Sequence, residues 1–243
     1  MVSKNQIKLI TSLRQKKFRL ANGLFLAEGV KVISELLNSH FELEHLYQTE
    51  PVFNNVAGDK ITDVTENELK KISALTTFNN CLALFKVPAP KKISNKGLIA
   101  VLDDIRDPGN LGTIIRLCDW FGISQIVCSH ETADVFNPKT IQASMGSIAR
   151  VNVDYTELPK YIMDSQLPVY GTFMEGNDIY STQLQKEGII VFGNEANGIS
   201  SKVERLIKNQ ISIPRFGELQ KAESLNVATA AAIVFSEFRR REL

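Results

Sequence analysis

The chain has 243 residues, of which 44% are hydrophobic and 23% are charged, and its formal net charge is +1. This composition is ordinary for a globular protein and excludes a wholly disordered chain, while the length fits one large domain or two smaller ones. No stretch approaches the apolar length of a membrane span, and the start lacks the apolar core of a signal peptide. We therefore expect a cytoplasmic protein with no membrane partner.

The cysteines predict neither a metal site nor disulfides. Cys81, Cys118 and Cys128 stand singly in apolar runs, without the paired spacing of metal ligands. This pattern favours buried thiols in a reducing compartment. The three histidines also lack neighbours that would complete a metal site, so no metal is expected.

Positive charge is concentrated at the front of the chain. Residues 1–98 carry 14 basic and 9 acidic side chains, a net of +5, whereas residues 99–243 carry 14 and 18, a net of −4. Charge alone does not decide between RNA binding and a solvated helix face. The side chains that could contact RNA phosphates are Lys4, Lys8, Arg14, Lys16, Lys17, Arg19, Arg239, Arg240 and Arg241.

The front of the chain predicts a small α/β unit. Apolar spacing predicts an amphipathic helix from Ile7 to Phe18 and a second helix over residues 30–37. The polar, proline-containing stretch 87–97 predicts a linker. We place the domain boundary there, with one domain over residues 1–95 and another over 96–243. Strands are predicted at residues 24–27, 43–47 and 81–87.

From Leu98 onward, apolar strands alternate with amphipathic helices. This alternation predicts an α/β domain with a mainly parallel sheet covered by helices. Ligands of such sheets bind beyond the carboxyl ends of the strands, so the loops there are the candidate site. Strands are predicted at residues 98–102, 125–128, 169–173, 188–192 and 211–213, and helices near 112–121, 138–147, 201–208 and 223–240.

The first of these loops carries Asn110 and Arg116. Apolar spacing leaves Arg116 off the packed face of the following helix, either as a functional group or as a solvated arginine. Asn110 is either a ligand contact or a helix cap. Gly109 and Gly112 do not match the glycine fingerprint of dinucleotide-binding folds, and no phosphate-binding loop is present. A nicotinamide enzyme and a nucleotide hydrolase are therefore disfavoured.

Two later loops also carry polar side chains beyond strands. In the second loop, Glu195 stands between Gly193 and Gly198, and glycines permit close approach to a ligand. Glu195 would equally favour the N-terminus of the next helix. In the third loop, Ser224 and Asn226 precede an alanine-rich helix, as caps or as ligand contacts.

Taken in order, these loops resemble the motifs of the SpoU/TrmH family of SPOUT RNA methyltransferases. The resemblance covers roughly residues 98–240, and the ordered combination is more specific than any single motif. The front 95 residues resemble that family's ribosomal-protein-like substrate-binding domain. The motifs are Asn110 to Arg116, Gly193 to Gly198, and Ile213-Pro214 followed by Ser224-Leu225-Asn226-Val227-Ala228, with Ala143 to Ser147 similar to an intervening segment.

The resemblance implies the fold, the cofactor and the site residues. It implies a C-terminal SPOUT α/β trefoil-knot domain, a homodimer and S-adenosylmethionine as cofactor. The residues implied around the cofactor are Thr172, Gly193, Ile213 and Leu225. Those implied around the reacting ribose are Asn110, Arg116, Glu195, Ser224 and Asn226. The connection 215–223 is longer and more charged than the family's usual loop.

The implied reaction is transfer of a methyl group from S-adenosylmethionine to a ribose 2′-hydroxyl of RNA. Ribosomal RNA is preferred because the front domain resembles a ribosomal-protein-like module suited to folded RNA. A tRNA 2′-O-methyltransferase and a non-catalytic RNA-binding protein of the same fold are the alternatives, and the ribose-type motifs disfavour a base methyltransferase. Because a guanidinium stays protonated in proteins, Arg116 is expected to orient the hydroxyl and not to act as a free base.

Overall fold

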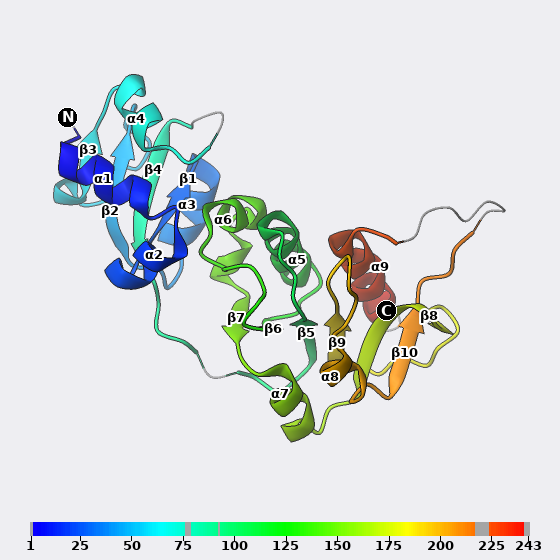
Figure 1. Cartoon of the computed structure of the whole chain (residues 1–243). Coiled ribbons are helices and arrows are strands. Elements are labelled where there is room, and N and C mark those ends of the chain that lie inside the picture. The colour runs from blue at the N-terminus through cyan, green and yellow to red at the C-terminus, as the bar shows by residue number, and fades with distance from the viewer. Residues whose placement is uncertain (1, 76–78, 92, 217–223, 241–243) are drawn as a thin grey trace. The chain divides into compact units, whose positions relative to one another are not determined.

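The computed structural model describes residues 2–75, 79–91, 93–216 and 224–240 (Figure 1). Contacts divide the chain into two units. One comprises Met1–Pro90 with Asp134–Ala149, and the other Lys91–Ala133 with Arg150–Leu243. The boundary at residues 95 and 96 stays a prediction. Within the region 96–243, the segment Asp134–Ala149 makes its contacts mainly with the first unit.

The first unit contains a four-stranded sheet in the order β1-β4-β2-β3. Strand β4 is antiparallel to β1 and β2, and β3 is parallel to β2. The predicted α/β character is confirmed, although β3 and α4 were not predicted. The elements are β1 (Leu24–Glu28), β2 (Leu43–Gln48), β3 (Ile61–Asp63), β4 (Cys81–Lys86), α1 (Lys4–Ser12), α2 (Lys16–Asn22), α3 (Val30–Leu37), α4 (Glu66–Ile72) and α6 (Pro138–Ser144).

The single helix predicted from Ile7 to Phe18 is wrong, because two helices occupy this region. The Ser3 hydroxyl caps α1 by accepting from Gln6 N at 3.2 Å, and Gln6 Oε1 accepts from Ser3 N at 2.8 Å. Leu13 lies in the turn after α1 yet is fully buried. The apolar spacing of α1 therefore continues to Leu13, although the helix itself has ended.

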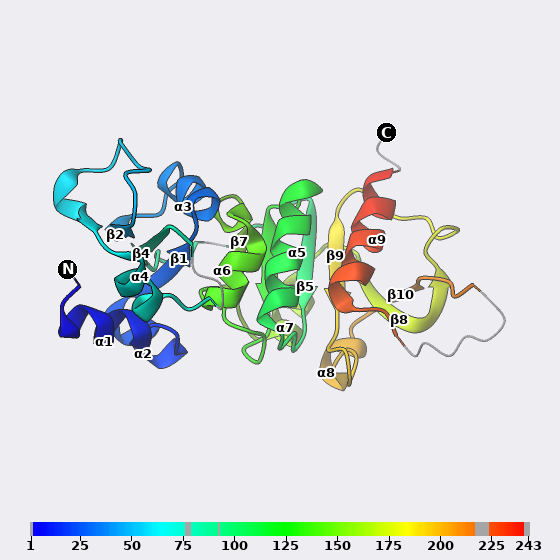
Figure 2. The same ribbon diagram turned by 90° about the horizontal axis from the view of Figure 1, so that it is seen from above.

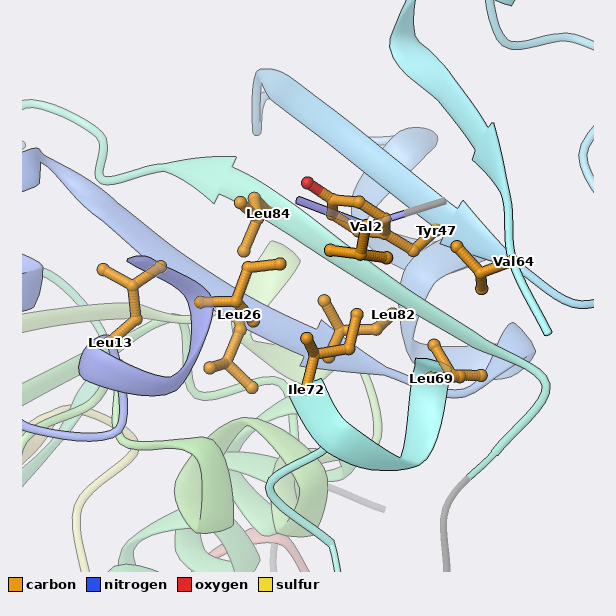
Figure 3. Close-up of a cluster of buried hydrophobic side chains, with 10 residues drawn as sticks. Val2, Leu13, Leu26, Tyr47, Val64, Leu69, Ile72, Leu82 and Leu84 are labelled. Atoms are coloured by element: carbon orange, nitrogen blue, oxygen red, sulfur yellow. The ribbon is translucent and has the colours of Figure 1, made fainter. Parts of the chain in front are cut away.

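The two faces of this sheet carry separate apolar groups, because alternate strand residues point to opposite faces. One group lies against α1 and α4 and includes Leu13, Leu26, Tyr47, Val64, Leu69, Ile72, Leu82 and Leu84 (Figure 3). Phe25, next to Leu26, instead packs against Phe85 and Phe136, with ring centroids 5.8 and 4.8 Å away. Since Phe136 precedes α6, this contact joins residues 134–149 to the first unit.

The prediction that Arg19 contacts RNA phosphate is wrong. Arg19 is only 2% exposed, and its guanidinium pairs with the carboxylate of Asp134. It also donates to the carbonyl oxygens of Leu13 and Arg14, at 2.8 and 2.9 Å. Arg19 therefore joins α2 to the segment carrying Asp134.

Two arginines near the C-terminus also have partners within the chain. Arg239 donates to the carbonyl oxygens of Phe121 and Gly122, at 2.8 and 3.1 Å. Arg240 donates to Glu237 at 2.8 Å. Their positive charge is thus already engaged, and Arg241 lies outside the described residues.

The second unit contains a six-stranded sheet in the order β10-β8-β9-β5-β6-β7, with every neighbouring pair parallel. This confirms the predicted parallel sheet, while β7 and α7 were not predicted. The strands are β5 (Leu98–Leu102), β6 (Gln125–Cys128), β7 (Asn152–Tyr155), β8 (Val169–Asp178), β9 (Gly188–Phe192) and β10 (Asn209–Ser212). The helices are α5 (Pro108–Trp120), α7 (Leu158–Asp164), α8 (Ser201–Glu204) and α9 (Val227–Arg240).

Helices cover both faces of this sheet, with α5 and α9 on one face and α7 and α8 on the other (Figure 2). Val101 of β5 packs in one cluster with Ile162 of α7 and Val203 of α8. On the opposite face, the ring of Phe192 meets Phe235 of α9 edge-on at 5.4 Å. The parallel arrangement brings the carboxyl ends of β5 and β9 to one edge, where ligands of such sheets bind.

The cysteines are buried, free thiols, as predicted. Burial raises the pKa of the Cys81 thiol to about 11 and also raises the pKa of Cys118 and Cys128. Because the thiolate is the reactive form, we expect iodoacetamide at about pH 8 to spare all three in the folded protein and to modify all three after unfolding. Intact-mass spectrometry counts the adducts, and labelling before unfolding would contradict the expectation.

Neither a membrane-spanning helix nor a metal-binding cluster is found among the described residues. No helix there combines the length and the apolar character needed to cross a membrane. The same residues contain no group of three or more His, Cys, Asp and Glu side chains placed to hold a metal ion.

Candidate active site

A pocket of about 1170 Å³ opens beside the ends of β9 and β10 in the second unit. Its walls come from β8, from the loop after β9, from the segment after β10 and from α9. Six of the predicted site residues line it, namely Thr172, Gly193, Glu195, Ile213, Ser224 and Leu225. Their individual roles remain predictions, but distant parts of the sequence meet here as expected.

One wall of the pocket is formed where β8 leaves its pairing with β10. Gln210 lies opposite Gly171, but the next residue, Ile211, lies opposite Asn177. The intervening residues 172–176 are displaced from the ladder, and those from Thr172 to Glu175 line the pocket. The strand was predicted to end at residue 173, because no pattern in the sequence signals this excursion.

The loop after β9 is a tight hairpin that carries the exposed Glu195. Asn194 and Gly198 exchange backbone hydrogen bonds of 3.0 and 2.8 Å. The Asn194 side-chain oxygen accepts from the backbone nitrogens of Ala196 and Asn197. A Cβ on Gly193 would lie 2.3 Å from the carbonyl carbon of Gly198. Glycine at 193 is thus required by the close approach of the two arms of the hairpin.

A directional chain of hydrogen bonds links the three predicted loops. The Asn226 side-chain oxygen accepts from the backbone nitrogens of Ala228 and Thr229, at 3.0 and 3.3 Å. Its Nδ2 therefore faces Asn110 and donates to Asn110 Oδ1 at 3.0 Å. Asn110 Nδ2 in turn donates to Glu195 Oε1 at 2.5 Å. The start of α9 thereby sets the orientation of the Glu195 carboxylate.

These contacts decide between the alternatives left open by the sequence. Asp107, not Asn110, is the N-cap of α5, and it accepts from Asn110 N at 2.8 Å. Asn226 does cap the start of α9 with its oxygen, but its nitrogen still reaches the neighbouring loop. Capping is therefore correct for Asn226, while its contact with a ligand stays a prediction.

Arg116 is not brought to the pocket. Its side chain is exposed on α5, and it makes no hydrogen bond or ion pair within the described ranges. The predicted position off the packed face of the helix is confirmed, because Ile115 and Cys118 on that helix are fully buried.

Sequence reasoning missed the contacts that join the Glu195 hairpin to the segment after β5. Asn194 Nδ2 donates to the carbonyl oxygen of Asp104 at 2.8 Å. The carboxylate of Asp103, only 5% exposed, accepts from Ser200 N at 2.7 Å. Asp104 adopts a φ of 59°, which is uncommon for a non-glycine residue. Two adjacent aspartates directly after a buried strand were the available signal.

The pocket combines an apolar floor with a polar rim. The floor includes Phe192, Ile211 and Val234, each 1% exposed, whereas the rim carries carboxylates at Glu175, Glu195 and Glu204, together with Arg215. S-adenosylmethionine fits this combination of apolar and acidic side chains. Its adenine suits a narrow apolar slot, and its sulfonium cation suits a rim rich in carboxylates. Residues 217–223 of the long connection lie outside the described residues.

Comparison with known proteins matches nearly the whole chain. Residues 97–236 match the SpoU rRNA Methylase family, and residues 4–83 match the MRM3-like substrate binding domain. The chain belongs to the SpoU rRNA methylase family. The resemblance inferred from the ordered motifs is therefore confirmed.

Three similar proteins extend over almost the full length. A Bacillus subtilis relative, the 23S rRNA (guanosine(2553)-2′-O)-methyltransferase RlmP, is 30% identical, covering 98% of this chain and 97% of its own. A TrmH-family structure from Porphyromonas gingivalis is 38% identical with a TM-score of 0.90, covering 99% of both chains. An AdoMet-bound rRNA methyltransferase from Sinorhizobium meliloti is 29% identical with a TM-score of 0.87, covering 100% of this chain and 98% of its own.

Proposed function

We propose that this protein transfers a methyl group from S-adenosylmethionine to a ribose 2′-hydroxyl of ribosomal RNA. The observation that carries the proposal is the hydrogen-bonded chain Asn226–Asn110–Glu195, in which Glu195 lines a pocket with an apolar floor. Family membership, the reaction in the name of the Bacillus relative and the AdoMet-bound Sinorhizobium structure support it.

Some of the site residues would hold the methyl donor, and others would position the ribose. Thr172, Gly193, Ile213 and Leu225 line the pocket and would hold S-adenosylmethionine, which supplies an electrophilic methyl group. Glu195, oriented by Asn110, can accept a hydrogen bond from a ribose hydroxyl. Positioning alone can supply roughly 7 to 11 kcal/mol of the barrier to such an in-line transfer, so geometry dominates.

The experiment that tests this function maps 2′-O-methyl sites across total RNA from cells with and without the gene. We expect one ribosomal RNA site to lose its methyl group on deletion and to regain it with the wild-type gene. Loss confined to a transfer RNA would favour the tRNA alternative. An unchanged map, together with no heat on titrating S-adenosylmethionine, would favour a non-catalytic RNA-binding protein.

For Arg116, which lies outside the pocket lining, we keep the role that the family resemblance implies, namely to orient the substrate and not to remove its proton. We expect Arg116→Lys to lower kcat/KM for RNA by roughly 10-fold or more, because a lysine cannot reproduce the guanidinium fork and a charged hydrogen bond is worth about 1.5 to 3 kcal/mol. Steady-state methyl transfer measures this, with the affinity for S-adenosylmethionine as control. Near-normal turnover would show that no fork-shaped contact is needed.

The first unit would bind the RNA. Its match to a substrate-binding domain and its exposed lysines on α1 and α2 support this role. Lys4, Lys8, Lys16 and Lys17 remain suitable for phosphate contact, whereas Arg19 is buried. Each phosphate contact of this kind would add to the salt dependence of binding.

The trefoil knot, the homodimer, the cytoplasmic location and the absence of a metal or membrane partner belong to the same proposal. Trp120, on α5, is 84% exposed, and an interface between two chains would bury it. Light scattering after gel filtration should give a mass about twice the 27.1 kDa of the chain. A mass of one chain would contradict the dimer.

A further inference from the structure

The rim of the pocket exposes large apolar side chains. Met174, Phe216 and Leu225 line the pocket and are 48%, 86% and 47% exposed. Exposed apolar side chains that line one pocket offer a surface that a bound ligand can cover. Phe216 is the most exposed of the three, and its ring meets no other aromatic ring within the described residues.

The floor and the rim suit different groups. Phe192 and Ile211 in the floor are each 1% exposed, so a ring bound there would be enclosed, whereas Phe216 faces solvent. The pocket volume, about 1170 Å³, exceeds the roughly 300 to 1,000 Å³ of typical small-molecule sites. It therefore has room for a second group at the open side.

Phe216 shares this rim with groups suited to a ribose. Glu195 and Ser224 line the same pocket and are exposed, and Glu195 is held by Asn110. A nucleotide whose sugar met these polar groups would bring its base to the neighbouring apolar side chains. Unstacked RNA bases are commonly bound by stacking on aromatic rings.

We propose that Phe216 stacks on the base of the nucleotide to be methylated, with Met174 as a second apolar contact at the rim. This inference rests on the proposed function and names a substrate contact outside the residues predicted from the motifs. Phe216 follows the Ile213-Pro214 pair, and Pro214 limits the backbone freedom of the segment that carries the ring.

The test compares Phe216→Ala, Phe216→Trp and Phe216→Leu in the full-length protein. The substrate is ribosomal RNA from cells lacking the gene, with radioactive methyl transfer as readout, and calorimetry gives the affinity for S-adenosylmethionine. Stacking of one base is worth roughly 5- to 150-fold. We expect Phe216→Ala to lower kcat/KM for RNA by about 10-fold with donor affinity unchanged, Phe216→Trp to retain activity, and Phe216→Leu to behave like alanine. Met163→Ala, another exposed apolar residue but outside the pocket lining, is the matched control and should be unchanged.

Several results would overturn the inference. If Phe216→Ala weakens S-adenosylmethionine binding and leaves the RNA dependence unchanged, the ring belongs to the donor site. If Phe216→Leu matches wild type, no aromatic face is required. An active wild type with an unaffected Phe216→Ala overturns this inference alone, whereas an inactive wild type overturns the proposed function and this inference with it.

Discussion

Replacing Asn226 with aspartate is expected to lower the turnover of methyl transfer by about 100- to 1,000-fold, the range seen when one preorganised donor is removed from an active site. The aspartate keeps the oxygen that caps α9 but loses the nitrogen that donates to Asn110. Asn110 would then turn its own nitrogen toward residue 226 and present its oxygen to Glu195. The carboxylate of Glu195 would lose its donor and its orientation.

The same substitution should leave the fold intact, which separates a positioning role from a structural one. Aspartate is an equally good helix N-cap, so we expect the free energy of unfolding in urea to change by less than about 1 kcal/mol. Asn226→Ala is the matched control, because it loses both the donor and the cap and should also cost about 1 kcal/mol of stability. Normal turnover in Asn226→Asp would remove the hydrogen-bonded chain from the mechanism.

Replacing Gly193 with alanine is expected to disrupt the Glu195 hairpin. The added Cβ would lie 2.3 Å from backbone atoms of Gly198 and Ile199, a contact that no side-chain rotation can relieve. We expect a loss of about 3 kcal/mol in the free energy of unfolding, at the upper end for overpacked sites. Turnover should fall by roughly 100-fold, because displacement by about 1 Å is enough to misplace a reacting group.

Gly198 in the same hairpin provides the control for this prediction. An alanine at 198 meets no atom within 4 Å, and its only cost comes from the φ of +68°. That conformation costs an alanine roughly 1 to 2 kcal/mol. Urea unfolding and steady-state methyl transfer should therefore show Gly193→Ala as the more damaging change. Equal effects at the two positions would show that the close approach at 193 is unimportant.

Much of the second unit is determined by local sequence. Strands β5, β6 and β9 begin and end where apolar runs predicted them, because a strand buried on both faces is a continuous apolar run. The short elements β3 and β7 were missed because neither contains a continuous, buried apolar run of the kind that marks the equally short β6.

The motifs identified which loops matter, but not how they touch. The sequence placed Asn110, Glu195 and Asn226 after strands, and a parallel sheet brings such positions to one edge. The direction of the hydrogen bonds among them is set at Asn226. Its side-chain oxygen accepts from the start of α9, which leaves its nitrogen to donate to Asn110, and this arrangement exists only once the loops are assembled.

The sequence by itself determined the α/β class, the parallel sheet and the family, because those follow from periodicity and from motifs that are short and ordered. Only the tertiary structure decided that Arg19 is a buried partner of Asp134, that residues 134–149 pack with the first unit, and that residues 172–175 lose their pairing with β10 and line the pocket. Each of these depends on contacts between residues far apart in the chain, and no local pattern encodes the partner that a side chain will meet.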